Sequence, residues 1–295
     1  MTDLSRTSAA DGFIPDYVLV GHVTRDVVGD GFVIGGTVTY AGLTALALGK
    51  TVGAVTSVGP EIDLARSLPG IRFQLRGAPA STTFENVYRD GHRQQWIRAV
   101  AERLDPGLVP AAWRSAPIVH LAPLAGEFGP EMIQVFEHCQ LLGLTPQGWL
   151  RTWNSHGYVR RSAWNNPEET LAACDAVVLS EEDVEGDWDV LRYYADVTKL
   201  LVVTQGALGC TVFDRGRPRQ VPAFPAHEVD ATGAGDVFAA AFFIGLLRDG
   251  DPVAAAHYAN CVASFAVEAL GTDGIPLPGA VAERLASRPS PIAVE

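Results

Sequence analysis

Short apolar runs alternate along the chain with longer segments of helical character. Such runs suit buried strands of a parallel sheet, and they occupy residues 17–21, 53–59, 117–122, 141–147, 175–179 and 200–204. Helices are expected between and after them, at about 37–48, 130–140, 237–247, 252–269 and 276–287. This alternation predicts an α/β fold with a doubly wound, mostly parallel sheet that is flanked by helices.

Two predicted hairpins interrupt the alternation of strands and helices. Residues 27–34 carry Gly29-Asp30-Gly31 between apolar pairs, and residues 82–98 flank Asp90-Gly91, a strong turn pair. The arms of the second hairpin mix polar and aromatic residues without a clean alternation. That mixture suits either a sheet that covers a polar ligand or an ordinary exposed hairpin.

Length and composition narrow the class of protein. The 295 residues with 47% hydrophobic content suit one large domain, expected over residues 14–288 with flexible tails at 1–13 and 289–295. A net charge of −12 argues against nucleic acid or an anionic membrane as a partner. It does not exclude a nucleotide, because a local site can be positive in a negative protein.

The four cysteines lie far apart in the sequence, at 139, 174, 210 and 261. This spacing predicts neither a zinc site nor a disulfide framework, and free thiols fit a reducing cytoplasm. No secretory signal is visible near the start, and the longest apolar run, Val237–Leu247, is too short to span a bilayer. A cytoplasmic protein is therefore expected.

The chemistry is concentrated in Asp230-Ala-Thr-Gly-Ala-Gly-Asp236, which runs directly into an apolar helix. Two glycines around Ala234 let the backbone turn sharply and approach a ligand. The helix behind them directs its free N–H groups and positive dipole end at the turn, which is a typical phosphate site. Asp230 could face a metal ion carried by the phosphate, and Asp236 could take a proton from an attacking hydroxyl. The alternative is a plain glycine turn with Asp236 as the helix N-cap.

This segment resembles the signature of the ribokinase-like (PfkB) carbohydrate kinases, in which an Asp and small residues precede Gly-Ala-Gly-Asp and a helix. The resemblance covers roughly residues 16–286, and its specificity lies mostly in residues 204–236. It implies a ribokinase-like fold with a small β-sheet lid over the sugar, and the strands at 27–34 and 82–98 would form that lid. It also implies ATP-dependent phosphorylation of a small sugar or polyol.

On the nucleotide side, the resemblance implies roles for several residues. The nucleotide phosphates would lie beneath the backbone of Thr204, Gly206 and Gly209, where the glycines carry no side chain. The same pattern also suits a simple strand–turn–strand. Asn260 would lie near the nucleotide, or would be an ordinary helix residue. Ser180 and Asp183 stand where the family orders Mg²⁺ through water, and they also form a capping-box pattern at a helix start.

On the acceptor side, Asp26 follows the first strand, at the edge where open α/β sheets bind ligands. The family uses such an Asp to bind sugar hydroxyls; the alternative is a loop Asp that caps a turn. Gly35 and Gly36 would allow close backbone approach, and Tyr40 stands where the family usually has Asn. The remaining candidates are the lid residues Glu85, Asn86 and Arg89, of unknown facing, and Arg151 as a displaced phosphate clamp.

Together these features predict an ATP- and Mg²⁺-dependent sugar or polyol kinase. Asp236 would be the base, and the backbone of Gly233, Ala234 and Gly235 would hold the charge that gathers on the transferred phosphoryl group. Residues 82–86 and 143–149 resemble the inositol kinase branch, so inositol, another cyclic polyol or a ketose is the expected acceptor, with a nucleoside less favoured. The sequence leaves open the use of a monovalent cation and whether the protein is a monomer or a homodimer through its lid.

Two other functions compete with this one. A non-catalytic nucleotide- or sugar-binding protein would explain the departures at Tyr40, Thr145, Ser180 and Asp183. It would not explain an intact Asp at the anion site. A dinucleotide-dependent oxidoreductase is disfavoured, because no Gly-x-Gly-x-x-Gly follows the first strand.

Overall fold

The computed structural model describes residues 12–89 and 92–287. The predicted 90–91 turn and almost all of both predicted tails lie outside these residues. Within them, a large sheet runs in the order β15-β14-β13-β12-β9-β8-β1-β4-β5 and is parallel from β13 to β5. Its strands are β1 (Tyr17–Val20), β4 (Val52–Val58), β5 (Ile71–Gly77), β8 (Ile118–Leu121), β9 (Leu141–Leu144), β12 (Ala176–Ser180), β13 (Leu200–Thr204), β14 (Cys210–Asp214) and β15 (Arg217–Val221).

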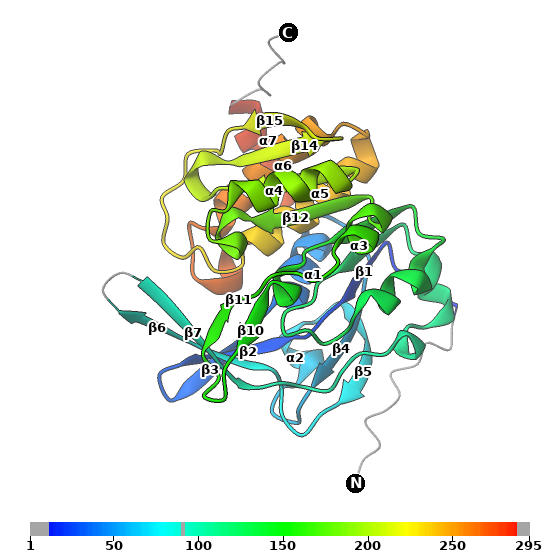
Figure 1. Cartoon of the computed structure of the whole chain (residues 1–295), viewed down its shortest axis with the longest axis vertical. Helices are drawn as coiled ribbons and strands as arrows, with labels where there is room; N and C mark the ends of the chain where they lie inside the picture. Colours follow the sequence, from blue (N-terminus) through cyan, green and yellow to red (C-terminus); the bar gives the residue numbers. More distant parts are fainter. Residues whose placement is uncertain (1–11, 90–91, 288–295) are drawn as a thin grey trace.

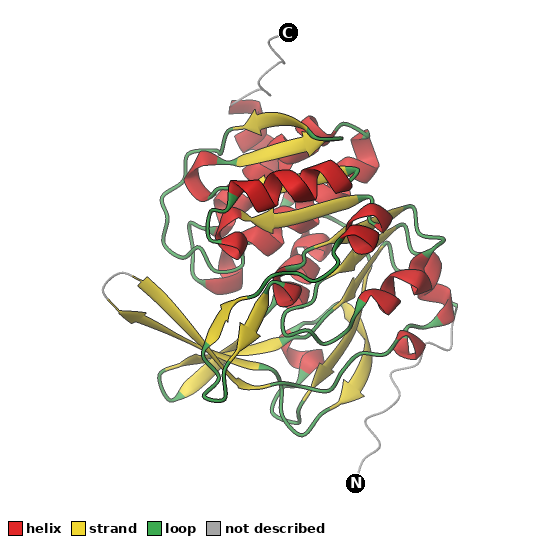
Figure 2. Ribbon diagram, in the orientation of Figure 1, coloured by secondary structure: helices red, strands yellow, loops and turns green. Residues whose placement is uncertain are grey.

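Helices cover both faces of this sheet, which confirms the predicted α/β fold class (Figures 1 and 2). Strand β1 shows the arrangement: Tyr17 and Leu19 enter one core, and Val18 and Val20 enter the other, as alternation along a strand requires. One core holds α1 (Thr37–Ala47), α5 (Ala234–Asp249), α6 (Pro252–Ala266) and α7 (Pro278–Ser287). The other holds α3 (Glu168–Ala173), α4 (Trp188–Val197) and the 3-10 helices η1 (Pro106–Leu108), η2 (Ala111–Ser115) and η3 (Pro130–Phe136).

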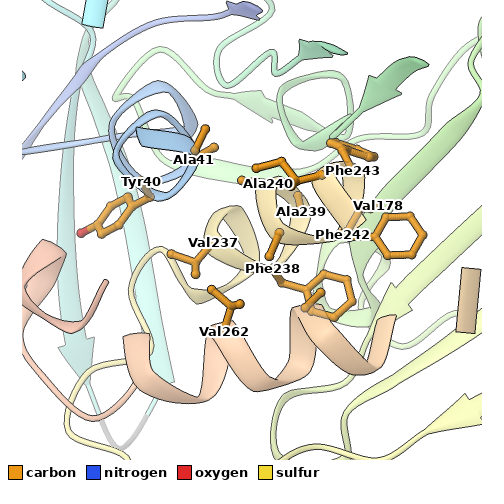
Figure 3. Close-up of a cluster of buried hydrophobic side chains, with 14 of the residues drawn as sticks. Tyr40, Ala41, Val178, Val237, Phe238, Ala239, Ala240, Phe242, Phe243 and Val262 are labelled. Carbon is orange, nitrogen blue, oxygen red and sulfur yellow. The ribbon is translucent and has the colours of Figure 1, made fainter. Parts of the chain in front are cut away.

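Helix α5 contains a long unbroken run of buried residues. Its residues Val237–Gly245 are all buried, and Figure 3 shows it between α1 and α6 with Phe238, Phe242 and Phe243 directed into the core. The sheet comes close to it at Gly143, where an added Cβ would lie only 2.6 Å from the ring of Phe243. Because this buried run begins at Val237, directly after Asp236, it holds the first turn of α5 in place. None of the helices formed by residues 12–89 and 92–287 is both long and apolar enough to cross a membrane.

The two predicted hairpins form one small sheet in the order β3-β2-β6-β7, which projects from the body at the lower left of Figure 1. Its strands are β2 (Thr24–Val28), β3 (Gly31–Gly35), β6 (Thr83–Arg89) and β7 (His92–Ala99). Strands β2 and β6 are parallel to each other, and the outer pairs are antiparallel. The first hairpin starts earlier than predicted, so Asp26 lies inside a strand and not in a loop.

Several elements differ from the sequence-based expectation. The predicted helix at 130–140 is the shorter 3-10 helix η3, and strands β5 and β15 were not predicted. Both strands are rich in polar residues, because each lies at an edge of the large sheet. A two-stranded hairpin, β10 (Arg151–Trp153) and β11 (Val159–Arg161), was also missed, and it lies beside β7. The remaining short elements are α2 (Leu64–Ser67), η4 (Gln147–Trp149), η5 (Glu181–Val184), η6 (Gly206–Leu208) and η7 (Gly271–Gly274).

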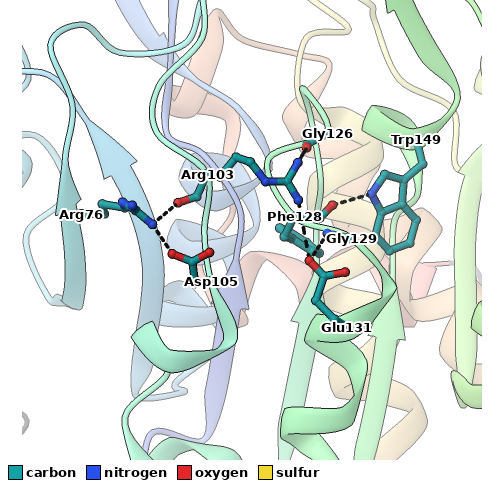
Figure 4. A network of polar contacts seen from close by, with 8 residues as sticks. All are labelled: Arg76, Arg103, Asp105, Gly126, Phe128, Gly129, Glu131 and Trp149. Carbon is teal, nitrogen blue, oxygen red and sulfur yellow. Dashed lines mark hydrogen bonds and ion pairs between the residues drawn. The ribbon is translucent and has the colours of Figure 1, made fainter.

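Polar contacts hold the long irregular segments that follow β7 and β8. Figure 4 shows Arg76 of β5 bound to Asp105 and to the carbonyl of Arg103, whose own guanidinium reaches Gly126 O at 3.3 Å. Trp149 Nε1 donates to Phe128 O at 2.9 Å in the same region. These side-chain contacts replace the backbone ladders that a strand or helix would supply.

The buried carboxylate of Glu127 joins two loops at the edge of the large sheet. It accepts the backbone N–H groups of His22 at 2.9 Å, Leu124 at 2.9 Å and Ala125 at 2.8 Å. Its side chain is 1% exposed. Glu127 therefore fixes the loop after β1 against the loop after β8.

We predict that Glu127→Ala lowers the free energy of unfolding by about 3 kcal/mol, because it leaves several buried N–H groups without a charged acceptor. Chemical denaturation at neutral pH measures this change. Glu137→Ala, at an exposed position after η3, is the control and should stay within about 0.5 kcal/mol of the wild type. Equal stability of the two variants would contradict the assigned role of Glu127.

Candidate functional site

The candidate site lies where the parallel strands of the large sheet end. The chain leaves β1, β9 and β12 at this edge, and the first turn of α5 meets it from the helical layer. Open α/β sheets bind ligands at the carboxyl ends of their strands. The first turn of α5 is therefore placed to offer its N–H groups to a ligand there.

The glycine turn before α5 has the geometry that the sequence predicted. Gly233 is the residue before the helix, with φ = +77°, which a side chain rarely adopts. A Cβ on Gly233 would also lie 2.3 Å from the Tyr40 ring. The N–H of Ala234 donates to Ala231 O at 3.2 Å, so this group is partly engaged within the turn.

Asp230 closes the base of the turn. One carboxylate oxygen accepts the N–H of Thr232 at 2.9 Å, and the other accepts the N–H of Gly271 at 3.1 Å. These bonds attach the glycine turn to η7 and give Asp230 a structural role, while the role predicted for it at a metal ion stays a prediction.

Asp236 lies in the first turn of α5, two residues after the first helical position, so it is not the N-cap. Thr37 Oγ1 donates a hydrogen bond of 2.7 Å to Asp236 Oδ1. Burial raises the pKa of Asp236 to about 6, against the lowering effects of the Thr37 hydrogen bond and the charge of Arg151. Asp183 and Asp26 raise this pKa further by repulsion. A carboxylate with such a pKa is ionised near neutral pH and is a competent proton acceptor.

These electrostatic interactions also show which predicted residues the fold brings together. Asp26, Asp183 and Arg151 all act on Asp236. Tyr40 is 3% exposed, and burial together with Asp26, Asp230 and Asp236 raises the pKa of its hydroxyl. The tyrosine is therefore a protonated hydrogen-bond donor among carboxylates.

Gly35 and Gly36, directly before α1, allow neighbouring groups to pack closely against the backbone. A Cβ on Gly35 would lie 2.2 Å from Asp26 Oδ2, so this glycine leaves room for the carboxylate. Gly36 has φ = +85°, and a Cβ on it would lie 2.9 Å from both His22 O and Leu124 Cδ1. The two glycines thus let α1 begin directly behind Asp26.

The lid residues Glu85 and Asn86 are neighbours in β6 and point to opposite faces of the lid, as successive strand residues do. Asn86 accepts a 3.0 Å hydrogen bond from Gln95 and is on the face of Phe84, the register partner of Asp26. Glu85 accepts a 2.7 Å hydrogen bond from Arg98 on the other face. Asn86 therefore shares the face of Asp26, and Glu85 does not. The side chain of Arg89 lies outside the described residues.

Ser180 and Asp183 form the predicted capping box at η5. Ser180 Oγ accepts the N–H of Glu182 at 3.2 Å, and Asp183 Oδ2 accepts the N–H of Ser180 at 3.0 Å. Gln147 donates to the other oxygen of Asp183 at 3.1 Å. In the part of the chain that the structure describes, no group of three or more His, Cys, Asp or Glu residues could hold a metal ion. A cation held mostly by phosphate and water, with Asp183 as an outer contact, still fits these residues.

The residues predicted to bind the nucleotide lie along β13 to β15. Thr204 ends β13, and Gly206 and Gly209 shape the turn into β14, with φ of +55° and +94°. A Cβ on Gly209 would lie 2.2 Å from Val221 O, so this glycine permits the turn to pack on β15. Asn260 is buried and donates to Val221 O at 3.1 Å and Pro222 O at 3.2 Å. Its amide thus attaches α6 to the end of β15.

Sequence reasoning missed Thr37. The only signal available for it was its place directly after the glycine pair, since its partner Asp236 lies 199 residues away along the chain.

Parts of the chain resemble a known protein family and several curated proteins. Residues 162–278 match the family described as pfkB family carbohydrate kinase. A fructokinase of Klebsiella pneumoniae is 36% identical over a segment that covers 32% of this chain and 36% of that protein. The matched segments span about a third of the length of the curated fructokinases that resemble the chain.

Solved structures match almost the whole chain. One is a pyrophosphate-dependent kinase in the ribokinase family complexed with a pyrophosphate analogue and myo-inositol, with a TM-score of 0.76, 24% identity, and 90% of this chain and 99% of that one covered. Another is Arabidopsis thaliana ribokinase complexed with ribose and ATP, with a TM-score of 0.69, 19% identity, and 92% and 99% covered. Residues 162–278 thus resemble the pfkB family of carbohydrate kinases, and nearly all of the chain has the fold of the ribokinase family.

Proposed function

We propose that the protein transfers a phosphoryl group from ATP to a hydroxyl of a small sugar or polyol. The observation that carries this proposal is Asp236, a carboxylate with a pKa near 6 in the first helical turn behind a glycine anion site. A base and an anion site at one helix end are the two elements that phosphoryl transfer to an alcohol requires.

In the proposed reaction, Asp236 orients the acceptor hydroxyl and takes its proton. Because Oδ1 accepts the Thr37 hydroxyl, Oδ2 is the oxygen assigned to the acceptor. The acceptor oxygen forms a bond to the γ-phosphorus, the bond from that phosphorus to the bridging oxygen breaks, and ADP leaves. The N–H groups of Gly233, Ala234 and Gly235 stabilise the charge on the transferred group.

Mg²⁺ bound to the phosphates would supply neutralisation of their charge. In this chain, Asp183 and Ser180 would hold it through water, and Asp230 would lie at the base of the same turn. Thr204, Gly206, Gly209 and Asn260 would border the nucleotide. No residue of this chain is assigned to a monovalent cation.

The acceptor would lie between α1 and the lid. Asp26, the Gly35-Gly36 backbone, Tyr40 and Asn86 are the proposed contacts, with the lid excluding water. A cyclic polyol such as inositol or a ketose is the proposed acceptor. Complexes with myo-inositol and ribose among the structural relatives support this class, as do the fructokinases among the sequence relatives.

Pyrophosphate is a second candidate donor. The observation that favours it is the higher TM-score of the pyrophosphate-dependent kinase, 0.76 against 0.69 for the ribokinase with ATP. Pyrophosphate has neither a nucleobase nor a ribose, so its binding would need only the glycine turn and the residues beside it.

The proposed setting is the cytoplasm, as a monomer or a homodimer through the lid. The lid exposes apolar side chains that a second copy could cover, with Val28 60% and Val33 51% exposed.

The first test is turnover by purified protein with Mg²⁺ and either ATP or pyrophosphate, over a panel of polyols, sugars and nucleosides. We predict turnover with one class of acceptor, and a loss of at least about 10²–10⁴-fold in Asp236→Asn, as for a lost general base. Phosphate or ADP release measures the rate, and circular dichroism confirms that the variant is folded. Binding of ATP and sugar without turnover would instead favour the non-catalytic binding protein.

A second prediction follows from the raised pKa of Asp236. The value of kcat/KM should fall about tenfold per pH unit below pH 6, because only the ionised carboxylate accepts a proton. Folding also disfavours the ionised form of Asp236, because burial raises the pKa of this carboxyl group. Asp236→Asn should therefore be more stable than the wild type by about 1–3 kcal/mol at pH 8, since the folded pKa lies above the unfolded one.

This stability gain should diminish as the pH falls through 6 and vanish below the unfolded pKa of about 3.8, where both states carry the protonated acid. Denaturation at pH 8 and at pH 3.5 tests the sign. If Asp236→Asn were less stable than the wild type at pH 8, folding would not disfavour the ionised form of Asp236, and the prediction would be wrong.

A further inference from the structure

We infer that Thr37 is a positioning residue for Asp236, so that the first turn of α1 sets the orientation of the base in α5. This inference rests on the proposed function and adds a residue that neither the sequence pattern nor the family match assigned.

The contact is short, and its donor residue is buried. Thr37 Oγ1 lies 2.7 Å from Asp236 Oδ1, and Thr37 is 2% exposed. Threonine is branched at Cβ, which restricts its first side-chain torsion and therefore the direction of its hydroxyl. Gly36 permits the approach, since a Cβ on it would lie 2.9 Å from the backbone of His22.

Helix α1 makes a second contact with the same turn of α5. Tyr40 is three residues after Thr37, on the same side of α1, and its ring lies where a Cβ on Gly233 would be. Figure 3 shows Tyr40 on α1 beside the start of α5 and Val237. One face of α1 thus fixes both the backbone of the anion turn and the carboxylate that follows it.

The Thr37 hydroxyl has a defined chemical consequence. As a donor to Oδ1, it favours the ionised carboxylate and leaves Oδ2 for the acceptor. The other groups that interact with Asp236 are Arg151 of β10, Asp183 of η5, Asp26 of β2, Tyr40 of α1 and Tyr17 of β1. Two of these groups, Asp183 and Asp26, are carboxylates that oppose ionisation, and Thr37 and Arg151 act against them.

Matched variants separate a positioning role of Thr37 from a purely structural one. Thr44, also buried in α1, donates its hydroxyl to Tyr40 O at 2.7 Å and is far along the helix from Asp236. Thr44→Val therefore removes a matched buried hydroxyl from the same helix without touching the base. Thr37→Val keeps the side-chain shape and removes the hydrogen bond to Asp236, and Thr37→Ser keeps the hydrogen bond.

The test compares these three variants in turnover. For Thr37→Val we expect kcat to fall about ten- to a hundredfold, as for a lost hydrogen bond to a charged group or a displaced base. We expect KM to change little and the acidic limb of the kcat/KM profile to move to higher pH. Thr37→Ser should recover most of the loss, and Thr44→Val should keep the wild-type pH profile. In an Asp236→Asn background, Thr37→Val should have almost no further effect.

A second readout needs no substrate. The ¹³C resonance of the Asp236 carboxyl, assigned by its loss in Asp236→Asn, should titrate at higher pH in Thr37→Val than in the wild type or Thr44→Val. An unchanged titration would overturn the inference, whether or not Thr37→Val is less stable. Wild-type kcat in Thr37→Val with an inactive Asp236→Asn would also overturn it, while leaving the proposed function intact. Failure of the proposed function itself would appear separately, as normal turnover in Asp236→Asn.

Discussion

The burial of helix α5 is the constraint on which the rest of the site depends. Its residues from Val237 to Gly245 are enclosed by α1, α6 and the sheet, so close packing on several sides holds the helix in position. Its first turn is the point where this buried helix reaches the edge at which the parallel strands end, where open α/β sheets bind ligands. A rigid helix end there can hold N–H groups and a carboxylate in fixed positions before any ligand binds, which is the preorganisation that electrostatic catalysis needs.

The same burial imposes an electrostatic cost on the ionised carboxylate of Asp236. Desolvation and the carboxylates of Asp183 and Asp26 push the pKa of Asp236 upward, and Thr37 and Arg151 push it back. The balance leaves a pKa of about 6, so the group is ionised at neutral pH and still basic enough to take a proton. The departure from the family pattern at Tyr40 has a structural explanation here. The ring supports Gly233, and its burial in the core accounts for an aromatic residue at that position.

Several candidate residues have structural roles that the sequence did not reveal. Asp230 attaches the glycine turn to Gly271, Asn260 attaches α6 to the end of β15, and Asp183 completes a capping box. Such roles are compatible with ligand contacts, because they fix the same side chains at the edge of the site. Glu85 differs, since its hydrogen bond to Arg98 is on the lid face opposite to Asp26.

The sequence by itself determined the alternation of strands and helices, the two hairpins and the segment Asp230–Asp236. These features depend on local hydrophobic pattern and on the conformational freedom of glycine, both of which are written in neighbouring residues. Only the tertiary structure decided that Thr37 bonds to Asp236, that Tyr40 lies against Gly233 and that Asn86, not Glu85, shares the face of Asp26. Edge strands β5 and β15 belong to this second group. Each of these outcomes depends on strand register or on helix packing between distant segments, and no local pattern encodes those relations.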